Sequence, residues 1–173
     1  MKALLTMCCL ALALPALAQT APAAAPDPFA PLAFLEGTWG AKATRPDGVA
    51  VDSSYLFRRE LKGHVLARRA ASTAACAGPA SFDCDHGDEL IVFQDAPGQP
   101  LKAFYADNEG HVIHYVVTTA APDDAVFLSE PGAGPRFRLE YTLAHGVMAG
   151  KFQIQMPGQV DWHSYLEWSG PRR

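Results

Sequence analysis

The chain has 173 residues, a length typical of about one domain. Apolar residues make up 49% of it and charged residues 18%, so it can bury a core and is not a disordered chain. The formal net charge is −4, and because nucleic-acid-binding proteins carry a basic excess, the composition argues against a nucleic-acid partner.

The first residues predict export rather than fold. Lys2 precedes an apolar run over residues 3–14, and Ala16-Leu17-Ala18 has the small-residue spacing of a cleavage site. Such a run is too short to span a membrane as a helix and is typical of a secretory signal peptide. We therefore expect residues 1–18 to be removed, and the mature chain to be secreted into the periplasm with no transmembrane segment.

Two cysteines remain after residue 18, Cys76 and Cys84. An even number of cysteines in an exported protein predicts a disulfide. Free thiols or thiols that bind a metal are the alternatives. The bond would close a short loop, which the chain-entropy model credits with roughly 2.5 kcal/mol.

Residues 19–28 are rich in Pro and Ala and predict an extended leader. Residues 29–36 can form one or two helical turns. After them, apolar and polar residues alternate, and turn sequences interrupt the alternation every eight to twelve residues. We expect a single all-β domain over residues 29–170, with a short N-terminal helical turn.

About ten strands are expected from this alternation. Their ranges are 37–44, 49–60, 64–73, 88–95, 100–107, 111–119, 125–130, 136–143, 147–156 and 159–168. Short connections favour antiparallel neighbours, and closing the sheet removes its exposed edges. The prediction is therefore a monomeric, antiparallel up-and-down β-barrel.

A barrel of this size has room for a small ligand, and strand phase predicts which side chains line it. The candidate ligand-binding residues are Trp39, Tyr55, Phe57, Arg59, Tyr105, Tyr115, Phe137, Tyr141, Phe152 and Trp162. Trp39 would close one end. One inward arginine of the doublets at 58–59 and 68–69 could pair with a ligand carboxylate.

Residues 28–40, PFAPLAFLEGTWG, place a short apolar segment before Gly-Thr-Trp at the start of the first strand. This resembles the calycin group of lipocalins and fatty-acid-binding proteins, and is most similar to nitrobindin-like ten-stranded barrels. The resemblance implies a haem ligand on the last strand, where His163 stands, and action on nitrogen oxides or peroxynitrite. The glycine-rich run of that family is replaced by Ala41-Lys42-Ala43-Thr44. His163 also shares its phase with Asp161 and Glu167, which points it outward unless a β-bulge intervenes.

No motif in the chain calls for catalysis, since nucleophile-elbow, phosphate-loop and zinc-protease patterns are absent from the sequence. The acidic run at residues 83–89 lacks the calcium-loop pattern, so no metal is expected. We expect a non-enzymatic protein that holds a largely apolar or amphipathic small molecule without a cofactor. The alternatives are a haem protein acting through His163, and an inhibitor that binds another protein through the loop at 74–87.

Overall fold

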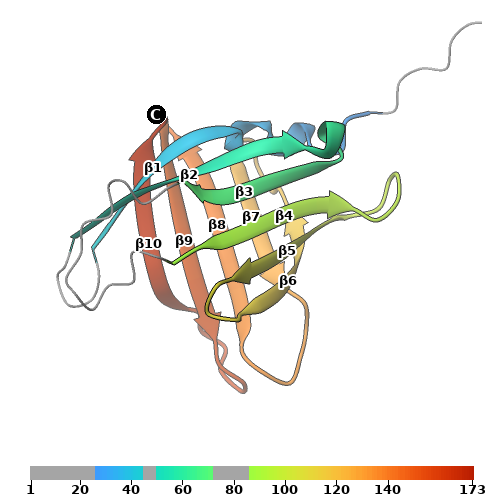
Figure 1. The fold of residues 1–173 in the computed structure, drawn as a ribbon. Coiled ribbons are helices and arrows are strands. Elements are labelled where there is room, and N and C mark those ends of the chain that lie inside the picture. Colours follow the sequence, from blue (N-terminus) through green and yellow to red (C-terminus); the bar gives the residue numbers. More distant parts are fainter. Residues whose placement is uncertain (1–25, 45–49, 72–85) are drawn as a thin grey trace, which may run out of the picture.

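The computed structural model describes residues 26–44, 50–71 and 86–173, and these form a closed antiparallel β-barrel (Figure 1). A short 3-10 helix, η1, precedes the strands, and a second one, η2, lies between β2 and β3. The elements are η1 (Ala30–Leu35), β1 (Gly37–Thr44), β2 (Ala50–Glu60), η2 (Leu61–Gly63), β3 (Val65–Ala71), β4 (Asp88–Gln94), β5 (Leu101–Asp107), β6 (Val112–Thr118), β7 (Asp124–Ser129), β8 (Arg136–Ala144), β9 (Val147–Gln155) and β10 (His163–Pro171). The predicted fold class is confirmed.

The strand order follows the chain. Each strand pairs with the next, and β1 pairs with β10 to complete the ring. All pairs are antiparallel. This is the arrangement that short connections and two-residue periodicity predict, because a closed sheet leaves no unpaired edge. The expected signal peptide, most of the leader, and both Cys76 and Cys84 lie outside the described residues. Within the part of the chain that is described, no helix combines the length and the apolar character needed to cross a bilayer.

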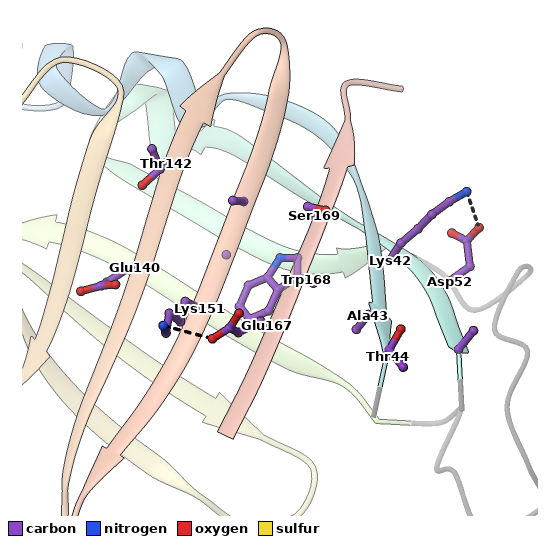
Figure 2. A pocket seen from close by; sticks show the side chains of 13 residues that line it. Lys42, Ala43, Thr44, Asp52, Glu140, Thr142, Lys151, Glu167, Trp168 and Ser169 are labelled. Atoms are coloured by element: carbon purple, nitrogen blue, oxygen red, sulfur yellow. Dashed lines mark ion pairs between the residues drawn. The ribbon is translucent and has the colours of Figure 1, made fainter. Parts of the chain in front are cut away.

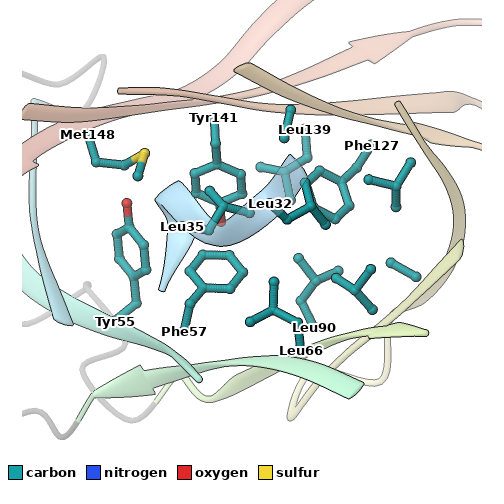
Figure 3. Close-up of a cluster of buried hydrophobic side chains, with 14 of the residues drawn as sticks. Leu32, Leu35, Tyr55, Phe57, Leu66, Leu90, Phe127, Leu139, Tyr141 and Met148 are labelled. Atoms are coloured by element: carbon teal, nitrogen blue, oxygen red, sulfur yellow. The ribbon is translucent and has the colours of Figure 1, made fainter. Parts of the chain in front are cut away.

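η1 closes one end of the barrel. Proline stands in its first turn, and its apolar residues Leu32 and Leu35 are fully buried. Figure 3 shows these leucines in the barrel interior, between the wall that carries Tyr55 and Phe57 and the wall that carries Tyr141. Complete burial of each leucine stabilises the fold by about 1.5–3 kcal/mol. We call this end the closed end.

Trp39 and Arg59 fasten the residues around η1. The indole Nε1 of Trp39 donates to the carbonyl oxygen of Leu35 over 2.7 Å. Arg59 donates from both terminal nitrogens to Asp27 over 2.9 Å, and from Nε to Glu36 over 2.7 Å. Its guanidinium also lies 4.8 Å from the ring centroid of Phe29. The segment before β1 is therefore held by both apolar burial and ion pairs.

The contact between β1 and β10, which we call the seam, is the point where the sheet closes. Its ladder pairs Lys42 with Ser169, and an isolated bridge pairs Trp39 with Arg172. Between them the backbones approach so closely that a Cβ on Gly170 would overlap the carbonyl group of Gly40. Glycine is required here because any side chain would push the two strands apart.

A β-bulge at Tyr165 reverses the alternation within β10. Ser164 faces Gln153 of β9, whereas Leu166 faces Phe152, so Tyr165 is the extra residue. After the bulge, Leu166 and Trp168 share the inner face with Phe152. Before it, His163 pairs with Ile154, which has the same parity as Phe152, and so takes the inner-face position. The bulge that would be needed to turn His163 inward is present.

The last strand also starts later than expected, at His163 instead of residue 159. After the turn at Pro157 and Gly158, the chain runs outside the ladder, where the Gln155 side chain donates to the Val160 carbonyl over 2.8 Å. Val160 is 87% exposed. Apolar residues in this stretch suggested a strand, but they do not pair with β9.

A substitution at Gly150 tests how tightly the inner face of the barrel is packed. It pairs with Trp168 in the β9–β10 ladder, and a Cβ at this position would overlap the indole ring. We expect Gly150→Ala to lower the free energy of unfolding by about 1–3 kcal/mol, because the ring must leave its position. Urea denaturation measures the change. Gly134→Ala is the control, since a Cβ added there would have no other group within 4 Å; equal losses in both variants would contradict this account of packing.

Candidate ligand-binding site

An aromatic cluster fills the middle of the barrel. Tyr55 and Tyr141 extend from opposite walls, with ring centroids 6.0 Å apart (Figure 3). Phe57 meets the Tyr141 ring edge to face at 5.3 Å, and Trp168 lies 5.9 Å from Tyr141 and 6.4 Å from Tyr55. Edge-to-face pairs at these distances are favourable beyond their burial. The interior beside η1 is therefore a packed core.

The opposite end, which we call the far end, is less completely packed. Phe137 near the start of β8 and Phe152 of β9 are stacked at 5.8 Å with an interplanar angle of 4°. Both point inward yet are only partly buried, as are Tyr105 and Ile113 across the barrel. Leu166, also on the inner face, is 40% exposed. Since inward apolar side chains reach water here, the far end exposes an apolar inner surface, which we call the cup.

A buried ion pair crosses the inner face between β3 and β4. Arg68 donates from Nη1 to Asp88 Oδ1 over 2.6 Å, and the two side chains are only 13% and 10% exposed. The guanidinium also lies 5.1 Å from the ring centroid of Tyr55. Arginine keeps its proton in proteins, so Asp88 provides the neutralising charge that a buried cation needs.

Four polar atoms around this pair are buried and have no hydrogen-bond partner among the described residues. They are the hydroxyls of Tyr55 and Tyr141, Nε of Arg68 and Nε1 of Trp168, and we call them the donor cluster. The Trp168 N–H lies near enough to Tyr55 to act on its hydroxyl, but not in hydrogen-bond geometry. Leaving a buried polar group unpaired costs about 1–3 kcal/mol. The inner wall therefore presents several donors without an acceptor.

A pocket of about 800 Å³ opens beside the seam (Figure 2). Most of its lining comes from outer-face side chains, and Trp168 is drawn between the ion pair Lys151–Glu167, at 3.1 Å, and the ion pair Lys42–Asp52, at 3.7 Å. Trp168 belongs both to the pocket and to the aromatic cluster. The pocket therefore borders the aromatic cluster at Trp168, whose Nε1 is itself buried.

A separate cluster occupies the turn between β5 and β6. Ligand-type atoms of Asp107, Glu109 and His111 lie within 4.8 Å of one another. Asp107 accepts hydrogen bonds from the backbone of Glu109 over 3.0 Å, from the backbone of His111 over 2.9 Å and from the hydroxyl of Tyr105 over 3.1 Å. Its Oδ2 also lies 2.9 Å from His111 Nδ1. These hydrogen bonds stabilise the turn between β5 and β6, and this structural role accounts for the cluster.

The structure distributes the predicted site residues over three environments. Fully buried side chains of the inner face are Trp39, Tyr55, Phe57, Tyr115 and Tyr141, and partly buried ones are Tyr105, Phe137 and Phe152. Arg59 is engaged by Asp27 and Glu36 at the closed end. Trp162 lies outside, where the guanidinium of Arg138 covers its ring at 4.7 Å.

Two residues of the donor cluster, Arg68 and Trp168, were not among the predicted site residues. Arg68 belongs to one of the arginine doublets, but sequence could not show which doublet faces the aromatic cluster. Trp168 lies on the inner face. Trp162 has the same parity in the sequence and was predicted to line the interior, but the bulge at Tyr165, which leaves no sequence pattern, turns it outward. Of the loop at 74–87, only residues 86 and 87 are described.

No model of a known protein family matches the chain, and comparison with curated proteins finds no similar sequence. The ten-stranded closed barrel agrees with a calycin-like architecture at the level of fold.

Burial gives the interior tyrosines a measurable response to alkaline pH. It raises the pKa of Tyr55, Tyr105, Tyr115 and Tyr141 above the ordinary value of 10.0, and Asp88 and Asp107 add to the effect at Tyr105. Since the folded chain holds these protons more tightly than the unfolded chain, their contribution to stability is intact below pH 10 and is lost as pH rises above it.

We therefore expect cooperative alkaline unfolding, in which the phenolate absorbance of these four tyrosines rises together with the loss of near-ultraviolet circular dichroism. Tyr141→Phe should make the pH dependence of the unfolding free energy shallower. Phenolate formation by all four while the dichroism of the folded state persists would contradict the burial described above.

Proposed function

We propose that this protein binds a small, largely apolar molecule in the cup at the far end of its barrel. The observation that carries the proposal is the partial exposure of inward-facing Phe137, Phe152 and Leu166, beside fully buried rings toward η1. A closed barrel with one packed end and one apolar cup suits a ligand that fits between aromatic walls. The expected export of the chain belongs to the same proposal, with binding taking place outside the cytoplasm.

Titration with the apolar dye Nile red tests this function. We expect saturable binding with increased emission, because the dye leaves water for an aromatic cup. Phe137→Ala should raise the dissociation constant for Nile red by about tenfold, which corresponds to a loss of about 1.4 kcal/mol in binding free energy, since it removes one of the two stacked rings.

Phe104→Ala is the matched control. Phe104 has outer-face parity on β5 and its ring faces that of His114 at 5.7 Å. The same truncation there should leave Nile red affinity unchanged. Absence of saturable binding, or equal loss in the two variants, would remove the cup as the binding site.

Haem binding is a second candidate, and the bulge at Tyr165 favours it. His163 takes the inner-face position opposite Ile154, at the rim of the cup. A neutral imidazole is a common haem ligand. The fit is partial, because His163 Nε2 already lies 3.1 Å from Gln159 Oε1, and haem would have to replace that contact. Under this proposal His163 would hold the iron, and the iron would supply the chemistry toward nitrogen oxides.

Haemin titration separates the two candidates. If haem binds, a Soret band appears in the wild-type chain and shifts or disappears in His163→Ala. A band that is absent, or that His163→Ala leaves unaltered, rejects haem ligation while leaving the apolar-ligand proposal in place.

A further inference from the structure

We propose that the ligand of this barrel is an uncharged molecule whose carbonyl oxygen is bound by the donor cluster. The inference rests on the proposed function and adds to it the chemical class of the ligand. Its basis is the set of unpaired atoms on Tyr55, Tyr141, Arg68 and Trp168.

The chemistry of these atoms indicates an acceptor. Nε of Arg68 and Nε1 of Trp168 are donors only, and each tyrosine hydroxyl carries a proton that has no acceptor among the described residues. A molecule that places one oxygen here satisfies groups that the fold leaves unpaired. A purely hydrocarbon ligand would leave all of them as they are.

The four groups converge on one region. The ring centroid of Tyr55 lies 6.0 Å from that of Tyr141 and 6.4 Å from that of Trp168. The Arg68 guanidinium lies 5.1 Å from the same Tyr55 centroid. They come from β2, β3, β8 and β10, which surround the barrel axis. Arg68 also lies in one cross-strand row with Tyr105 and Ile113 of the cup, through Leu90. A ligand bound in the cup would therefore extend along this row toward the donors.

The charges around the donor cluster favour a neutral ligand oxygen over an anionic one. Asp88 neutralises Arg68 at 2.6 Å, and Asp107 stands on the same face next to Asp88 in the ladder. A ligand carboxylate would bring a further negative charge close to these two acids, whose repulsion a buried site does not screen. A carbonyl oxygen accepts the same hydrogen bonds without that repulsion.

Displacement of Nile red by three related molecules tests the inference. Butylbenzene, butyrophenone and phenylbutyrate share a phenyl ring and a short chain, and differ in having no oxygen, a ketone and a carboxylate. In the wild-type chain we expect butyrophenone to bind about tenfold more tightly than either of the others, since a site built to donate hydrogen bonds discriminates against molecules that cannot accept them.

Tyr141→Phe and Trp168→Phe should each reduce the preference for butyrophenone over butylbenzene toward unity. Tyr165→Phe is the matched control, because Tyr165 is 67% exposed and lies outside the donor cluster, and it should retain the preference. Equal affinities in the wild-type chain, or an unchanged preference in both cluster variants, would overturn the inference. Tightest binding of phenylbutyrate would replace it with an anion site.

A stability measurement on the unliganded chain gives an independent readout. If the Tyr141 hydroxyl is unpaired, Tyr141→Phe leaves the urea midpoint unchanged or raises it. A lowered midpoint would mean that a buried water already satisfies the hydroxyl, and the inference would then fail. If none of the three molecules displaces the dye and the dye itself does not bind, the proposed function fails, whereas displacement without preference overturns the ligand class alone.

Discussion

The barrel depends on the pairing of its first and last strands. The other neighbours in the sheet are joined by short connections or by one longer loop, whereas β1 and β10 lie at opposite ends of the sequence. Their ladder is brief, and it requires Gly170 to lie against the backbone of Gly40 without a side chain between them. Arg172 covers the Trp39 ring at 4.6 Å, and the Arg173 backbone donates to the Thr38 carbonyl over 2.8 Å. Together these contacts turn an open meander into a container with a defined inside.

Much of this fold could be predicted because alternation and turn sequences are local properties. Gly37–Thr44 and Asp88–Gln94 appear within a residue of their expected limits, since a turn sequence containing Pro and Gly follows each of them. The bulge at Tyr165 could not be predicted, because an extra residue in a strand depends on how two strands align and not on the residue itself. One such residue exchanges the faces of everything before it, which is why Trp162 lies outside and His163 takes an inner-face position.

The sequence could predict which side chains line the barrel interior, but not which of their polar groups would be left without a hydrogen-bond partner. Strand parity identifies Tyr55, Phe57 and Tyr141 as inward, and the structure places all three in the buried cluster. Strand parity does not predict which inward polar side chains form hydrogen bonds or ion pairs. Arg59 and Arg68 have the same parity in their ladder and the same side chain, yet Arg59 fastens the chain before η1 while Arg68 stands among tyrosines with one nitrogen unpaired. That difference arises from tertiary contacts far apart in sequence.

The position of the closure has a consequence for the order of folding. The residues that complete the ring, from Trp168 to Arg173, are synthesised after the other nine strands of the barrel, and they pair with residues of its first strand. No partial chain can therefore seal the barrel, however many strands have already been made. Until β10 has been made and has paired with β1, the inward rings have only a curved, unsealed sheet to cover them, and that intermediate carries two bare edges where aggregation would begin.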